Sequence, residues 1–188
     1  MAQFELVLLG YVVSVGEMSR KIRLNYIYAT AETWERFDLA CEQLGWANKS
    51  LVQQCVHAFF AKHQGFYAQS ALKDLAAREM DEHDYYRILR DESEAKLPKY
   101  VKGRPGFGVT PLDEVDSLEE GIQRTYNVVT LSNYNSVLLK VARIVDTGPM
   151  VQVVSRIVHH HFETYWETNY FPQIERDKKL IFSLKEIR

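Results

Sequence analysis

The sequence KIRLNYIYA, residues Lys21–Ala29, decides how this chain is expected to fold. Its residues alternate between two faces. One face holds Ile22, Leu24, Tyr26 and Tyr28, and the other holds Lys21, Arg23, Asn25 and Ile27. A period of two residues is typical of a β-strand with one buried face and one solvent-facing face. The stretch is therefore predicted to be a half-buried strand.

Two helices are predicted directly after this strand. Thr30 or Thr33 can cap the first helix, which keeps a helical spacing of apolar residues until Gly45 ends it. The second helix is predicted from Asn48 or Ser50 to about residue 67. Its apolar stripe consists of Leu51, Val52, Cys55, Val56, Phe59 and Phe60. Together these segments form a βαα unit.

A second strand-helix-helix pattern occurs near the end of the chain. Thr125–Leu131 is rich in β-forming residues, Ser132 or Asn133 can cap a helix, and Gly148 with Pro149 separates two predicted helices. The apolar residues of the two helices follow their counterparts by 104 and 102 residues, which predicts a shorter turn between the helices in the second unit. We interpret the recurrence as an internal duplication, and a coincidence of two βαα patterns is the alternative.

Charge divides the chain into three parts. Residues 1–68 hold six bases and six acids, residues 69–122 hold eight bases and thirteen acids, and residues 123–188 hold nine bases and six acids. The first part is predicted to contain an N-terminal strand at Leu6–Val15 and the first βαα unit. The middle part is predicted to be a connector with one acidic amphipathic helix and a basic loop containing Gly and Pro. The last part holds the second unit and a C-terminal extension.

The overall composition excludes several classes of protein. A chain of 188 residues with 46% hydrophobic residues and a formal net charge of −2 is expected to fold, and is neither collagen-like nor disordered. Cys41 and Cys55 lack the spacing of a zinc or redox motif, and three consecutive histidines, His159–His161, fan around a helix. No GxSxG, P-loop, GxGxxG or HExxH motif occurs. We therefore expect a cytoplasmic protein that is not an enzyme and holds no metal or other cofactor.

These features resemble the ribbon-helix-helix family of Arc, MetJ and CopG type DNA-binding proteins. The clearer resemblance covers Lys21–Phe60, with its strand KIRLNYIYA and its segments LACEQLG, WANKS and LVQQCV, and a weaker one covers Thr125–Phe162. It implies an α+β, mostly helical fold in which the ribbon-helix-helix unit occurs twice. A two-stranded antiparallel ribbon would then lie on a four-helix core, with a helical and loop connector between the units. It also implies a sequence-specific DNA-binding protein that regulates transcription.

The resemblance implies that outward side chains of the ribbon read bases in the major groove. The predicted base contacts are Lys21, Arg23, Asn25 and Ile27 in the first strand, and Thr125 and Asn127 in the second. Arg and Lys can donate to guanine, Asn can pair with adenine, and an isoleucine can contact the thymine methyl group. A passive solvated surface is the alternative. In the second strand either the odd-numbered or the even-numbered residues of 125–130 face outward.

Two further groups of residues are candidates for contact with phosphate. Arg20, Asn48, Lys49 and Ser50 are predicted there because the family places the start of its second helix against the DNA backbone. Ordinary helix capping is the alternative for the last three. In the connector, Lys99, Lys102 and Arg104 form either a mobile basic arm or an exposed linker.

The expected partner is double-stranded DNA, and no membrane partner is expected. One chain can fold as an intramolecular pseudo-dimer that reads an asymmetric site, or a homodimer can pair two first units and read a palindrome. The rival interpretation is a ribbon-helix-helix-derived protein-interaction or assembly module without DNA binding. The net charge and the absence of a cation in the predicted second strand favour that rival.

Overall fold

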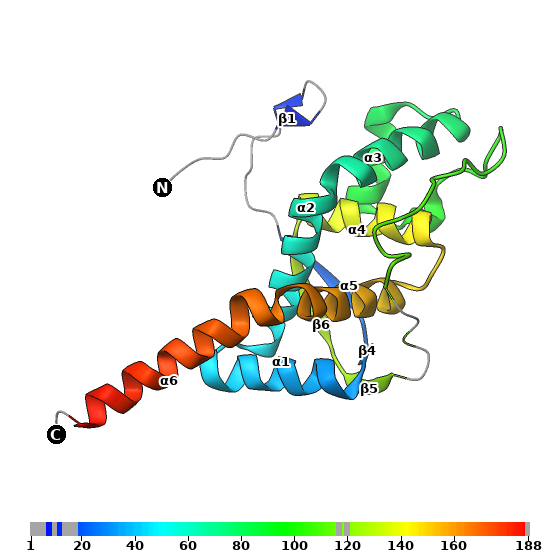
Figure 1. Ribbon diagram of the computed structural model, residues 1–188. Coiled ribbons are helices and arrows are strands. Elements are labelled where there is room, and N and C mark those ends of the chain that lie inside the picture. Colours follow the sequence, from blue (N-terminus) through cyan, green and yellow to red (C-terminus); the bar gives the residue numbers. More distant parts are fainter. Residues whose placement is uncertain (1–6, 9–10, 13–18, 116–117, 119–120, 187–188) are drawn as a thin grey trace.

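The computed structural model describes residues 7–8, 11–12, 19–115, 118 and 121–186. The fold is α+β and mostly helical (Figure 1). The strands are β1 (Val7–Leu8), β2 (Tyr11–Val12), β3 (Ser19–Arg23), β4 (Tyr26–Ala29), β5 (Ile122–Thr125) and β6 (Val128–Ser132). The helices are α1 (Ala31–Leu44), α2 (Asn48–Ala77), α3 (Glu82–Asp91), α4 (Asn133–Asp146), α5 (Met150–Tyr165) and α6 (Phe171–Glu186). A 3-10 turn, η1 (Glu94–Lys96), and a π-helical turn, η2 (Trp166–Tyr170), complete the secondary structure.

Two segments about 100 residues apart in the sequence pair to form one antiparallel ribbon. Strand β3 pairs with β6, and β4 pairs with β5. Between these pairs, the N–H of Leu24 donates to the carbonyl of Asn127 (3.2 Å) and the N–H of Tyr126 donates to the carbonyl of Asn25 (2.8 Å). The two pairs therefore belong to one continuous ribbon within a single chain, which we call the 19–29/122–132 ribbon.

Each side of the ribbon passes into a helix that is capped in the same way. Thr30 and Ser132 each accept the backbone N–H three residues further on, and they lie 102 residues apart. Gly45 and Thr147, at the ends of α1 and α4, both adopt the left-handed conformation and are also 102 residues apart. Helices α1 and α4 both contain 14 residues.

The predicted spacing of 104 residues between the first helices is therefore wrong. It came from matching apolar residues, which aligned Trp34 with Leu138. The caps instead align Trp34 with Ser136, a polar residue that is itself buried. The helix-helix turns consequently have the same length, because α2 and α5 also begin 102 residues apart.

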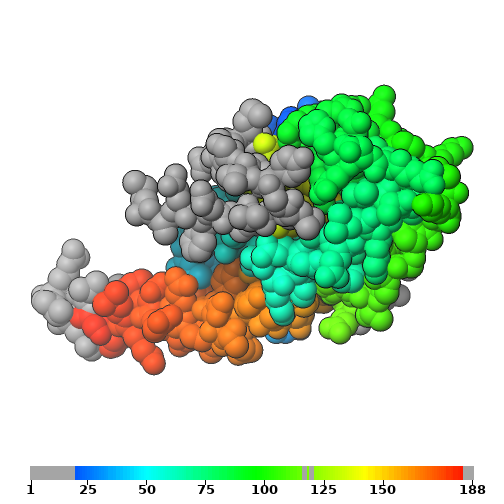
Figure 2. Space-filling view, turned by 90° about the horizontal axis from the view of Figure 1, so that it is seen from above, coloured from blue at the N-terminus to red at the C-terminus, as the bar shows by residue number. Residues whose placement is uncertain are grey.

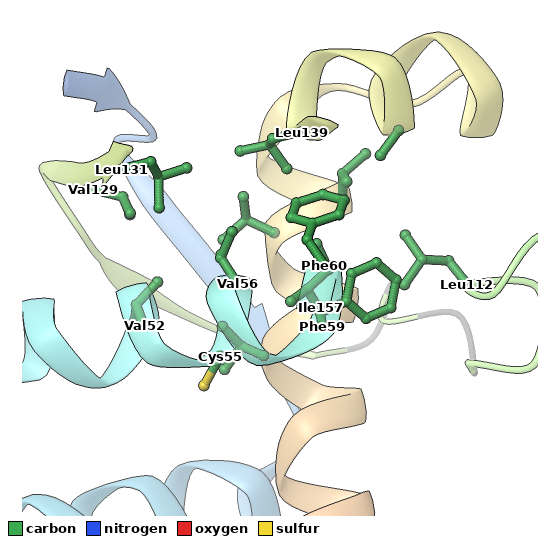
Figure 3. Packing of buried hydrophobic residues seen from close by; sticks show 14 of the residues in the cluster. Val52, Cys55, Val56, Phe59, Phe60, Leu112, Val129, Leu131, Leu139 and Ile157 are labelled. Carbon is green, nitrogen blue, oxygen red and sulfur yellow. The ribbon is translucent and has the colours of Figure 1, made fainter. Parts of the chain in front are cut away.

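One hydrophobic core joins the inner face of the ribbon to helices α1, α2, α4 and α5. Burial of this apolar surface is the main force that holds the two halves of the chain together. Figure 3 shows how side chains from both halves meet there. The labelled members are Val52, Cys55, Val56, Phe59, Phe60, Leu112, Val129, Leu131, Leu139 and Ile157.

The connector differs from the single amphipathic helix that was predicted. Helix α2 continues past residue 68 to Ala77, and a separate helix, α3, follows after a short turn. The buried carboxylate of Asp74 accepts hydrogen bonds from Arg78 (2.8 Å), from the Tyr85 hydroxyl (3.0 Å) and from the Tyr100 hydroxyl (2.7 Å). This one side chain therefore fixes the end of α2, helix α3 and the following loop to one another.

The two terminal segments are described only in part. The predicted strand at residues 6–15 falls partly outside the described residues, and within it β1 and β2 pair antiparallel. The C-terminal segment is one helix, α6, which extends away from the rest of the molecule (Figures 1 and 2). Among the described helices, none has both the length and the apolar character needed to cross a membrane.

Candidate nucleic-acid interface

Three of the predicted base-contacting residues lie on the outer face of the ribbon, two of them in β3 and Asn25 between β3 and β4. Lys21, Arg23 and Asn25 are all exposed. Lys21 lies opposite Thr130 and Arg23 lies opposite Val128 in the antiparallel register. The intervening residues of the strand point the other way, because side chains alternate across a strand. The face away from the core is therefore where these cations are available to a ligand.

Asn25 interrupts the alternation and changes the face on which the next residues lie. Its φ of +65° places it in the left-handed region, which Asn tolerates better than most residues. Leu24 is buried before it and Ile27 is buried after it, so two successive residues lie outside the core instead of one. The predicted contact of Ile27 with a base is wrong, since Ile27 has no exposed surface and belongs to the core.

The second strand changes faces at the matching place. Thr125 and Asn127 are exposed, as predicted, whereas Tyr126 is buried between them. Val129 and Leu131 are buried in turn. Neither of the two predicted registers therefore holds along the whole strand, because the alternation shifts by one residue after Asn127.

The ribbon also contains residues that the sequence did not predict as part of the site. Tyr26 and Tyr28 lie half-buried with their rings 5.1 Å apart, and Gln123 is exposed opposite Tyr28. Arg124 adds a cation to a strand that was expected to have none, because the strand begins at residue 122 and not at 125. Arg124 contacts helix α1, with its guanidinium 2.6 Å from the carboxylate of Asp38. The sequence carries no signal for the two tyrosines, because nothing in the residue pattern requires the left-handed conformation of Asn25 that shifts the alternation.

The start of α2 lies next to the ribbon. The hydroxyl of Tyr126 donates to the carbonyl of Asn48 (3.3 Å). Asn48, Lys49 and Ser50 are exposed, and the capping position is Ala47, which provides no side-chain hydrogen bond. The N–H groups of a first helical turn have no partner within their helix. Since no acid occurs in that turn of α2, its N-terminus is suited to an anion.

Arg20 is held by helices α3 and α4. Its guanidinium lies 2.7 Å from the carboxylate of Asp91 and donates to the side-chain oxygen of Asn133 (3.2 Å). A phosphate contact by Arg20 would have to compete with this carboxylate. Arg20 is therefore engaged by neighbouring helices, whereas Lys21 and Arg23, which lie close to it in the sequence, are exposed.

The basic loop is fastened to the body by two of its three cations. Arg104 donates to the carbonyls of Ile144 (3.0 Å) and Val145 (2.8 Å) at the end of α4. Lys102 lies 3.4 Å from the carboxylate of Glu79, and Lys99 is exposed and has neither a hydrogen bond nor an ion pair to another described side chain. The interpretation of these residues as a mobile arm is wrong for Arg104, whose contacts bind it to a helix terminus.

Two of the three consecutive histidines are engaged with neighbouring side chains in the interior. His159 is hydrogen-bonded to the hydroxyl of Thr33 (2.7 Å), and His161 is hydrogen-bonded to the hydroxyl of Tyr170 (2.9 Å). Within the described residues, no three His, Cys, Asp or Glu side chains gather in a way that could hold a metal ion.

Comparison with protein-family models, with curated proteins and with solved structures found no match for this chain.

Proposed function

We propose that this chain is a sequence-specific binder of double-stranded DNA that regulates transcription, and that it inserts the 19–29/122–132 ribbon into the major groove. The observation that carries the proposal is the outer face of this ribbon. It presents Lys21, Arg23, Asn25, Thr125 and Asn127 to solvent beside the open N-terminus of α2.

We further propose that the chain is a duplicated ribbon-helix-helix protein. A spacing of 102 residues holds at the caps and at both ends of α1 and α4, and at the starts of α2 and α5, and this supports the proposal. The buried positions also agree at that spacing. All four buried residues of α1, Thr33, Trp34, Phe37 and Ala40, have buried counterparts in α4, namely Asn135, Ser136, Leu139 and Ala142, and α4 buries Leu138, Val141 and Val145 in addition. The two hydrogen bonds at the centre of the ribbon are also equivalent at this spacing. Their donors, Leu24 and Tyr126, are 102 residues apart, and so are their acceptors, Asn25 and Asn127.

The shape and chemistry of the ribbon suit a DNA groove. A major groove about 12 Å wide admits a two-stranded β-ribbon. Lys21 and Arg23 can donate to guanine, and Asn25 and Asn127 can each form a bidentate pair with adenine, with about 1–3 kcal/mol of discrimination for each good pair. The N–H groups at the start of α2 would fix the register by binding a phosphate.

The two halves of the ribbon differ in chemistry. At the 102-residue spacing, Lys21 corresponds to Gln123 and Arg23 corresponds to Thr125, whereas Asn25 corresponds to Asn127. All of these residues are exposed. The proposed target is therefore asymmetric: its centre has related bases on both sides, and guanine is favoured on one flank only.

The experiment is a selection of random double-stranded DNA fragments by the purified chain at moderate salt. A variant with Lys21→Ala, Arg23→Ala and Asn25→Ala is compared with a control carrying Lys178→Ala and Lys179→Ala. The control removes the same formal charge from exposed positions on α6. The wild type and the control should enrich the same motif, and the ribbon variant should enrich none.

Failure of the wild type to enrich any motif would overturn the proposal. An equal enrichment by the ribbon variant would show that DNA is bound elsewhere. In the first case the outer face of the ribbon would be better explained as a protein-interaction surface, for which the half-buried Tyr26, Tyr28 and Val128 are suitable contacts.

A further inference from the structure

A hollow lies where α2, the α1–α2 connection and the α5–η2–α6 segment meet. Its volume is about 510 Å³, within the range of about 300–1,000 Å³ that is typical of small-molecule sites. Trp46 lines it from the connection, and Gln54 and Lys62 line it from α2. Asn169 and Gln173 line it from η2 and α6. None of the residues used in the proposed DNA contact lines this hollow.

The π-helical turn η2 helps to shape the hollow. Such turns are rare, and they occur frequently at functional sites. Here the turn brings Tyr170 back over the end of α5, where its ring stacks on Phe162 (5.3 Å) and its hydroxyl meets His161. Ala58 and Ala61 face the same hollow from α2, and their small side chains leave the space open.

His161 is the buried polar group of the hollow. Its side chain is 5% exposed, and its Nε2 atom is hydrogen-bonded to Tyr170. Its Nδ1 atom is buried without a protein partner. The imidazole and the Tyr170 hydroxyl bond to each other, so contact with a ligand falls to the exposed side chains that line the hollow, Gln54, Lys62, Asn169 and Gln173.

The charge and the walls of the hollow define the ligand. Lys62 carries the charge among the lining residues, and none of them bears a carboxylate. Trp46 and Tyr165 provide aromatic surface, and three side-chain amides provide hydrogen bonds. We propose that this hollow is a binding site for a small organic acid that has a flat aromatic ring and a carboxylate directed at Lys62.

The test uses 2-naphthoate and its neutral counterpart 2-naphthamide as probes, with binding to the full chain measured by ligand-observed NMR and by calorimetry. Naphthoate should bind about fivefold tighter than the amide, the effect expected for one solvent-accessible charge pair. Lys62→Met should remove this preference, whereas Lys73→Met, an exposed cation of α2 outside the hollow, should retain it. Ala58→Phe should abolish binding of both probes by filling the space.

Three results would overturn the inference. They are the absence of binding by both probes, equal affinity for the acid and the amide, and unchanged binding by the Ala58→Phe variant when its thermal unfolding resembles that of the wild type. The measurement requires no DNA. The inference can therefore fail while the proposed function stands, and the reverse is equally possible.

Discussion

Ile27 shows whether a residue of the ribbon belongs to the hydrophobic core or to the outer face that is proposed to contact DNA. It is fully buried, whereas Ile122, in the strand paired with its own, is 50% exposed. We expect Ile27→Ala to lower the free energy of unfolding by about 2–4 kcal/mol, because it leaves a cavity in the core. Ile122→Ala, the matched control, should cost well under half of that. Denaturant unfolding measures both, and similar losses would contradict the placement of Ile27.

His161 should make stability depend on pH. Burial is the main cause that lowers the pKa of His161 from 6.5 to about 4. The native imidazole therefore stays neutral in a range where the unfolded chain takes up a proton. The resulting contribution to stability is present above about pH 6.5 and is lost as the pH falls toward 4.

The measurement compares wild type with His161→Gln by denaturant unfolding at several pH values. Between about pH 7 and pH 5 the wild type should lose about 2 kcal/mol more than the variant. Burial also lowers the pKa of His63 and of His160, so both proteins should retain a pH dependence in the same direction. Parallel curves for the two proteins would rule out a neutral, buried His161.

At the scale of a helix, the start of α2 combines poor capping with a suitable place for an anion. Ala47→Asp should stabilise the helix by about 0.5–2 kcal/mol, because Asp is a good capping residue and Ala is not. The same carboxylate should repel phosphate and weaken DNA binding. Ala47→Ser adds a cap without a charge and should stabilise the helix while largely keeping the affinity. If both variants bind DNA equally well, α2 does not contact phosphate.

At the scale of the ribbon, the asymmetry of its two halves can be removed. Gln123→Lys with Thr125→Arg would place the Lys and Arg of the first strand at the corresponding positions of the second. We expect the motif recovered by DNA selection to become palindromic. Gln123→Ala with Thr125→Ala is the control and should keep an asymmetric motif. A motif unchanged by the first pair of substitutions would mean that these positions do not read bases.

At the scale of the whole molecule, one chain supplies both strands of the ribbon. We therefore expect a single chain to bind one DNA duplex, with a mass in solution close to that of one chain. Lys49 and the N-terminus of α2 are the groups assigned to phosphate, whereas Lys21 and Arg23 are assigned to bases, so about two phosphate contacts are predicted. The logarithm of the affinity should then fall with the logarithm of the salt concentration with a slope near −2.

Light scattering and binding titrations over a salt series test this prediction. Two chains per duplex would contradict the closed intramolecular ribbon as the DNA-binding unit. A slope near zero would contradict a phosphate-bound complex. The net charge of −2 does not oppose such a slope, because thirteen of the 25 acids fall in residues 69–121, which are not part of the ribbon.

Features that depend on local chemistry could be predicted from the residues alone. Alternation of side chains located the first strand, Thr30 or Thr33 and Ser132 or Asn133 marked the helix starts, and Gly45 marked a helix end; the structure has Thr30 and Ser132 as the caps. These signals act over a few residues, so they can be read without the rest of the chain. The exposure of Lys21 and Arg23 followed from them.

The burial of Ile27, the contacts of Arg20 and Arg104, and the pairing of the strands depend on the complete fold. A left-handed Asn25 shifts the alternation by one residue, and nothing in the residue pattern requires that conformation. Arg20 and Arg104 are held by groups 71 and 40 residues away. Pairing of β3 with β6 inside one chain depends on the core that both halves share, because burial of apolar surface is non-directional and is set by the complete fold.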